Sequence, residues 1–218
     1  SDVCSSDLQD DELHGGSGND SLYGGFGSDS LEGSLGEDWL YAGFNSAGGG
    51  NVVDVNTVSG GHDDDYLYGD IGDDLLLGGL GFDTVYGLSG VDQIYGGADG
   101  DQLNGGSGAD FIYAEDGNDR LYGDDGDDYL VPGAGLDWLY GGLGTDVLYH
   151  IAIGPVSLNA TRLADDANKS ITDIEHVRLD GTAANDVFDI GNWTRSPVMV
   201  DGKGGTDRVE STGNADFV

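Results

Sequence analysis

The chain has 218 residues, of which 42 are Gly, 42 are Asp or Glu and only seven are Lys or Arg, so its formal net charge is −35. This acidity excludes nucleic acid as a direct partner, because a phosphate backbone requires a basic face. No apolar run approaches the ~20 residues that a membrane-spanning helix needs. Residues 1–149 hold 31 of the acids but a single base, Arg120, whereas residues 150–218 hold six bases. The two parts of the chain therefore follow different patterns.

The opening stretch SDVCSSDL resembles the translation of a sequencing adaptor. We therefore expect residues 1–5 to be a non-native N-terminal scar, and we leave them out of the fold argument. Cys4 is the single cysteine of the chain. No disulfide is expected, so an extracellular form of the protein would need another kind of cross-link.

A nine-residue repeat organises residues 6–149. Units such as GGSGNDSLY (15–23) and GGLGFDTVY (78–86) follow one another sixteen times without a frame shift. Position six is Asp in fourteen units, and position eight is Leu, Ile or Val in fifteen. Positions one and four are Gly in eleven units each. A fixed period of this kind is typical of a solenoid.

Each recurrent position has a physical meaning. Glycines at positions one and four allow a tight turn over positions one to six. The remaining three residues form a short strand whose aliphatic residue at position eight faces inward. The pattern predicts an all-β fold, a parallel β-roll with two nonapeptides per rung and eight rungs in all. Its core is a thin column of aliphatic side chains, and the position-six aspartates lie along two turn edges.

The consensus GGxGxDxUx, in which U is aliphatic, resembles the repeats-in-toxin (RTX) family of calcium-binding β-rolls that Gram-negative bacteria secrete. The resemblance implies that a Ca²⁺ ion lies between equivalent turns of successive rungs, with about nine good sites in this chain. The implied ligands are the position-six carboxylates Asp20, Asp29, Asp38, Asp65, Asp74, Asp83, Asp92, Asp101, Asp110, Asp119, Asp128, Asp137 and Asp146.

Two further expectations concern these edges. Counting sixteen units in strict alternation places Asp20 and Asp38 on the same edge as Asp74 and leaves Asp29 without a good partner. Position five is often acidic as well, as at Asp64, but we expect it to contribute at most a carbonyl oxygen.

Elementary chemistry also favours calcium. Stacked carboxylates repel one another at every rung, and a hard divalent cation held by carboxylates and turn carbonyls removes that repulsion. Ca²⁺ accepts roughly six to eight oxygen ligands in flexible geometry, whereas Mg²⁺ requires a near-ideal octahedron and keeps its waters.

The rest of the chain departs from the repeat in three places. Residues 42–59 form a degenerate rung without good sites, although Asp54 and Asn45 could hold one ion weakly. Residues 150–201 contain short β-branched segments and are expected to be a β-rich connector that continues the coil less regularly. The repeat resumes at residues 202–218 and stops one residue short of a period, which we expect to be a truncation.

Nine tyrosines occupy position nine, beside the inward residue, and should therefore face outward. The functional interpretation is an aromatic platform for a glycan or another surface. The structural interpretation, which we favour, is a ladder of stacked rings that stabilises the sheet. These residues are Tyr23, Tyr41, Tyr68, Tyr86, Tyr95, Tyr113, Tyr122, Tyr140 and Tyr149.

No catalytic motif of the metalloprotease, serine-hydrolase or phosphate-loop type occurs, and the four histidines are scattered. We expect a non-catalytic calcium-binding module of a secreted or cell-surface bacterial protein. It would fold on calcium after type I-like export and have a structural or adhesive role. The alternative is an accessory module of a secreted enzyme (a protease, a lipase or a polysaccharide epimerase) whose catalytic domain lies outside this sequence.

Overall fold

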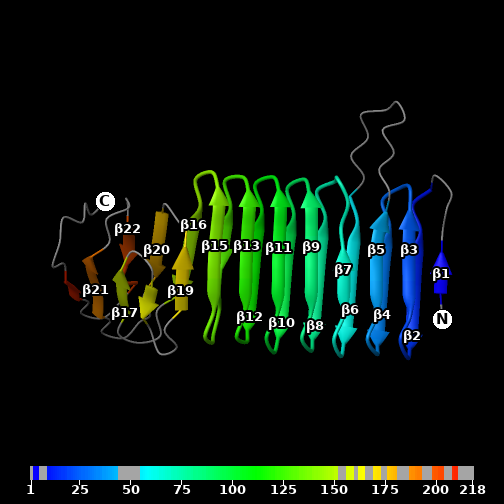
Figure 1. Ribbon diagram of the computed structural model, residues 1–218, viewed down its shortest axis with the longest axis horizontal. Coiled ribbons are helices and arrows are strands. Elements are labelled where there is room, and N and C mark those ends of the chain that lie inside the picture. The colour runs from blue at the N-terminus through cyan, green and yellow to red at the C-terminus, as the bar shows by residue number, and fades with distance from the viewer. Residues whose placement is uncertain are drawn as a thin grey trace.

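The computed structural model describes residues 2–4, 9–43, 55–151, 156–159, 162–164, 169–172, 176–180, 187–192, 198–203 and 208–210. The described residues form strands and turns in two sheets that stack their strands along the long axis of the molecule (Figure 1). None of the described residues belongs to a helix, so the structure contains no helix in this part that could cross a membrane.

Successive strands of residues 12–151 alternate between the two sheets. Within the described residues, the sheet named here sheet A contains, in spatial order, β1 (Asp2–Cys4), β3 (Ser21–Gly25), β5 (Trp39–Gly43), β7 (Tyr66–Tyr68), β9 (Thr84–Ser89), β11 (Gln102–Ser107), β13 (Arg120–Asp125), β15 (Trp138–Leu143), β19 (Lys169–Thr172), β18 (Arg162–Ala164), β17 (Val156–Asn159), β21 (Val187–Asn192) and β23 (Arg208–Glu210). Sheet B contains β2 (Glu12–Ser17), β4 (Ser30–Leu35), β6 (Thr57–His62), β8 (Leu75–Leu80), β10 (Gln93–Ala98), β12 (Phe111–Asp116), β14 (Tyr129–Val131), β16 (Val147–Ile151), β20 (His176–Asp180) and β22 (Val198–Asp201).

The nine-residue period fixes the register of the sheets. Ile94 in β10 pairs with Leu76 in β8 on one side and with Ile112 in β12 on the other, and all three strands are parallel. Residues one rung apart are thus separated by two nonapeptides, as the sequence predicts. The predicted all-β parallel solenoid is confirmed.

The strands are longer than the sequence suggests. Most run for six residues, from position seven of one unit to position three of the next, as in β8 and β10. Glycine at position one therefore lies inside the strand and not in the turn. It faces inward, and the space that a side chain would need there is already occupied by the neighbouring turn.

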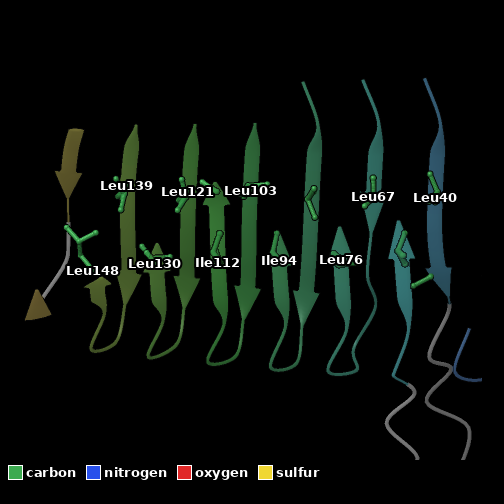
Figure 2. Close-up of a cluster of buried hydrophobic side chains, with 14 of the residues drawn as sticks. Leu40, Leu67, Leu76, Ile94, Leu103, Ile112, Leu121, Leu130, Leu139 and Leu148 are labelled. Atoms are coloured by element: carbon green, nitrogen blue, oxygen red, sulfur yellow. The ribbon is translucent and has the colours of Figure 1, made fainter. Parts of the chain in front are cut away.

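The core is a single column of aliphatic side chains from position eight, contributed by both sheets (Figure 2). Leu76, Ile94 and Leu103 are fully buried, as are most members of the column. Beyond the repeats, Val177, Leu179 and Val198 extend it. Because the core is so narrow, contacts along the turn edges must contribute much of the stability of the coil.

Strand pairing around residues 42–59 shows that the repeat units do not alternate strictly between the two sheets. Leu31 in β4 pairs with Val58 in β6, and Leu40 in β5 pairs with Leu67 in β7, so three nonapeptides separate these partners and not two. One extra nonapeptide lies between Gly43 and Val55, and residues 44–54, including Asn45 and Asp54, lie outside the described residues.

Residues after 150 continue the coil, as expected for the connector. β19 pairs with β15, and β20 pairs with β16, in parallel. The connector is less regular, because β18 runs antiparallel to both β17 and β19. Within the resumed repeats at 202–218, β23 pairs with β21, and Asp207 and Asp216 lie outside the described residues.

A core substitution should be costly in so thin a column. Ile94→Ala removes a fully buried side chain and leaves a cavity. We expect it to lower the free energy of unfolding by about 2–5 kcal/mol. The adjacent, exposed Gln93 is the matched control, and Gln93→Ala should stay within about 0.5 kcal/mol of the parent. Urea denaturation followed by circular dichroism measures both, and equal losses would contradict this account of the core.

Candidate metal centre

The position-six aspartates form two buried ladders, one along each turn edge. The backbone N–H of each residue donates a hydrogen bond to Oδ1 of its counterpart one rung further along. Asp74 N lies 2.8 Å from Asp92 Oδ1, and Asp92 N lies 2.8 Å from Asp110 Oδ1. Asp92 is 0% exposed. One carboxylate oxygen of each aspartate is thereby fixed at the boundary between two rungs.

The second carboxylate oxygen is buried without a hydrogen bond in many of these residues. This is the case for Oδ2 of Asp38, Asp65, Asp83, Asp92, Asp101, Asp110 and Asp128. A buried acceptor without a partner costs on the order of 1–3 kcal/mol, and more when it is charged. A row of such atoms in equivalent positions indicates that a ligand is needed to satisfy them.

The glycines at position one bring backbone oxygens close to these orphaned atoms. A Cβ placed on Gly78 would lie 2.5 Å from Asp83 Oδ2 and 2.5 Å from the carbonyl oxygen of Gly96, one rung away. Gly96 repeats the arrangement, with Asp101 Oδ2 at 2.5 Å and the Ala114 carbonyl oxygen at 2.8 Å. Any side chain at Gly78 would fill the space between a carboxylate oxygen and a carbonyl oxygen.

In the absence of a cation, burial raises the pKa values of these carboxyl groups and disfavours their ionised form. Desolvation raises the pKa of Asp92 to about 8, against the hydrogen bond from Asp74 N–H, which lowers it, and with repulsion from Asp110 and Asp74, which raises it. The pKa values of Asp65 and Asp101 are also raised to about 8, and that of Asp83 to about 6, again chiefly by desolvation. A bound cation would reverse this balance and favour the ionised form.

The donor set is one of oxygens, and it suits calcium. Among the described residues, no group of three or more His, Cys, Asp or Glu side chains converges on one point. A cation at these edges must therefore draw on backbone carbonyls in addition to the paired aspartates. Ca²⁺ accepts such mixtures of carboxylate and carbonyl oxygens in flexible geometry. The residues present fit this ion.

The structure brings the predicted ligands together but corrects their distribution between the edges. Asp38 N lies 2.7 Å from Asp65 Oδ1, across 27 residues. The extra nonapeptide reverses the alternation, so Asp20 and Asp38 share an edge with Asp65 and not with Asp74. The ladder on this edge consists of Asp20, Asp38, Asp65, Asp83, Asp101, Asp119 and Asp137.

The other edge gains residues that the sequence argument left aside. Asp29 Oδ1 accepts the N–H of Asp11 at 2.9 Å, and the N–H of Asp29 donates to Asn56 Oδ1 at 2.8 Å. Asp29 thus has a partner on each side. The ladder on this edge consists of Asp11, Asp29, Asn56, Asp74, Asp92, Asp110, Asp128 and Asp146.

Position five forms a third set of contacts that the sequence argument missed. Asp64 Oδ1 accepts the N–H of Phe82 at 2.8 Å, and Asp73 Oδ1 accepts the N–H of Val91 at 2.8 Å. The expectation that Asp64 offers an ion at most a carbonyl stays a prediction, but its carboxylate has a structural role between rungs that the sequence argument did not foresee. The frequent Asp and Asn at this position were the available signal, because both bond readily to nearby turn backbone.

Several of the position-nine tyrosines stack as predicted, but the ring centroids of Tyr122 and Tyr140 lie 6.5 Å apart with an interplanar angle of 52°. The rings of Tyr23 and Tyr41 stack with centroids 4.8 Å apart and an interplanar angle of 3°, and Tyr41 stacks on Tyr68 at 4.8 Å and 7°. Tyr95 and Tyr113 stack in the same way on sheet B. Stacked rings cover one another's faces, so the arrangement gives no support to a glycan platform on these tyrosines.

The comparisons with known proteins agree with this geometry. A family model for the RTX calcium-binding nonapeptide repeat matches residues 7–44, 54–76, 68–103, 95–130 and 133–150. These segments cover more than half of the chain, which therefore belongs to this family of calcium-binding β-rolls. No curated protein matches the chain.

The raised pKa values predict an unusual pH dependence for the metal-free roll. A carboxyl whose pKa is raised on folding stabilises the folded state while it is protonated, and this contribution is lost as the pH rises through the folded-state pKa. Because the ordinary pKa of Asp is 3.8, the loss falls between roughly pH 4 and pH 6 for Asp83, with a pKa of about 6, and between roughly pH 4 and pH 8 for Asp92, with a pKa of about 8.

Circular dichroism of the chelated chain between roughly pH 9 and pH 5 tests this, since the range stays above the sequence pI of about 4.1. The β signal should rise as the pH falls. The control is the calcium-dependent part of the signal, which should change in the opposite direction because protons compete with the ion for the carboxylates. A metal-free β signal that is constant or falls on acidification would contradict the prediction.

Proposed function

We propose that this chain is a calcium-binding module of a secreted bacterial protein, which is unfolded at low calcium and folds when calcium occupies its turn edges. The observation that carries the proposal is the row of buried, orphaned Oδ2 atoms at position six, exemplified on one edge by Asp65, Asp83 and Asp101. These atoms lie in register, one rung apart, on a chain with a net charge of −35.

The residues along each turn edge have different roles in ion binding. Position-six carboxylates supply charged oxygens, and carbonyls such as that of Gly96 approach the same space from the next rung. When bound, the ion would offset the repulsion between successive carboxylates, which otherwise opposes stacking of the rungs. Position-one glycines such as Gly78 keep the space open, because a side chain there would collide with both oxygens.

The ladders suggest more sites than the nine expected from the sequence. Two additional neighbouring pairs, Asp38 with Asp65 and Asp11 with Asp29, now lie one rung apart. We propose that Asp38 and Asp65 bind an ion in the same way as the pairs in the middle of the array. Asp11 is only part-buried, so its pair with Asp29 is less shielded from solvent than the pairs in the middle of the array.

Secretion fits this chemistry. Calcium is scarce in the cytosol, whereas extracellular calcium-binding modules work at about 10⁻⁴–10⁻³ M. The chain would then stay unfolded and exportable inside the cell, through a type I-like route, and would fold outside. The module has a non-catalytic role in this proposal. The same folding step would serve an adhesive surface protein or accompany a secreted enzyme, because it needs only the repeats.

Removal of calcium should therefore unfold the repeats at neutral pH. In excess chelator we expect a largely disordered circular dichroism spectrum, and millimolar Ca²⁺ should restore the β signal because binding energy is folding energy in such a module. Mg²⁺ at the same concentration is the control and should fail to do so. Full native β content in chelator at neutral pH would refute the proposal.

Replacing a single ladder aspartate should weaken calcium-dependent folding, most of all where that residue contacts a rung on each side. Asp92 contacts a rung on each side, so Asp92→Asn should raise the calcium midpoint of folding about tenfold, which corresponds to ~1.4 kcal/mol. Asp125 is the matched control, because it is exposed and lies at position three, outside the ladder. Asp125→Asn removes the same charge and should leave the midpoint nearly unchanged. If calcium titrations showed the same rise in midpoint for both variants, the loss of charge alone, and not the loss of a ligand, would explain the effect. If neither midpoint rose, Asp92 would not be a ligand.

A further inference from the structure

One junction between rungs is built differently from its neighbours. Asn56 is the only residue other than Asp at position six in the described units, and it is 0% exposed. Its Oδ1 accepts the N–H of Asp29 at 2.8 Å, as an aspartate would. Its Nδ2 donates to Asp74 Oδ1 at 3.0 Å, which no carboxylate can do. Asn56 thus replaces the repulsion between two acids by a hydrogen bond.

Asp74 is satisfied by the protein on both of its oxygens. Oδ1 accepts two hydrogen bonds from Asn56, from the backbone N at 2.8 Å and from Nδ2. Oδ2 accepts the backbone N–H of Asp70 at 2.8 Å. The Oδ2 atoms of Asp83 and Asp92 have no such donor. These three N–H groups favour the charged form of Asp74 and partly offset the desolvation that raises its pKa to about 6.

The local backbone explains where the extra donor comes from. Position two has a positive φ in neighbouring units, 117° at Gly61, 124° at Gly79 and 79° at Leu88. Asp70 occupies position two of its own unit and does not have a positive φ. Its side chain instead accepts the Gly72 N–H at 2.7 Å, which holds the turn in the altered shape. In this shape the Asp70 N–H reaches the Asp74 carboxylate.

We propose that the junction between Asn56 and Asp74 is closed by the protein's own hydrogen bonds and takes no calcium ion, and that Asn56 determines this. The inference rests on the proposed function, in which the junctions between two aspartates do bind calcium. It divides the sites of this edge into one group before Asn56 and one after Asp74. This junction directly follows the one between Asp29 and Asn56, which the extra nonapeptide lengthens to 27 residues.

The number of bound ions tests the inference. Native mass spectrometry of the full chain at saturating calcium gives the count for the parent and for two variants. Asn56→Asp restores an acid pair with Asp74, and another with Asp29, and should bind at least one ion more than the parent. Asn56→Ala removes the amide but keeps both backbone donors to Asp74, and should bind the same number as the parent. An ion lost from Asn56→Ala, or no ion gained by Asn56→Asp, would overturn the inference.

A third variant separates this inference from the proposed function. Asp92→Asn places an asparagine in a junction whose Asp92 Oδ2 is orphaned and where no Asp70-like donor exists, so it should bind fewer ions than the parent. A parent that binds no calcium, or an Asp92→Asn variant with the parental count, refutes the ligand assignment of the proposed function. Unexpected counts confined to the Asn56 variants refute only the role of Asn56.

Discussion

The structure depends on like charges held one rung apart in a buried position. Each position-six aspartate is fixed by a backbone N–H from the preceding rung, so it cannot move away from its neighbours without breaking the ladder. Desolvation and mutual repulsion both oppose the ionised form, as the raised pKa of Asp101 records. A cation, or another source of positive charge or hydrogen-bond donors, that reaches these carboxylates would therefore stabilise the stacked rungs.

The rest of the sequence is arranged around this constraint. Position-one glycines leave room beside the carboxylate, as at Gly78, and therefore add no side chain to the interior. Apart from Ala42 and Ala114 at position one, the repeats build their core from position eight, so Ile94 and its equivalents form a single narrow column. Stacked tyrosines on the outer faces and position-five hydrogen bonds at the turns add contacts between rungs that need no metal.

The distribution of charge along the chain follows the same logic. Beyond the repeats, Arg and Lys side chains of the protein itself pair with a buried carboxylate. Asp180 in β20 is buried, and it is bridged by Arg178 Nε at 3.0 Å and Lys203 Nζ at 2.8 Å. Tyr149 OH donates a further hydrogen bond to Asp180 at 3.0 Å. A carboxylate in the connector is thus paired by basic side chains, whereas residues 1–149 hold a single base, Arg120, for 31 acids.

The sequence by itself determined the period, the parallel coil and the aliphatic column, and it singled out the position-six aspartates, because each of these depends on residues at fixed short spacing. It also predicted the stacking of Tyr23 on Tyr41. Only the tertiary structure decided which aspartates share an edge, since strand pairing across the extra nonapeptide joins Leu40 to Leu67 and reverses the alternation. It alone revealed that Asp70 turns its N–H toward Asp74, because that contact depends on a backbone conformation which the repeat pattern does not specify.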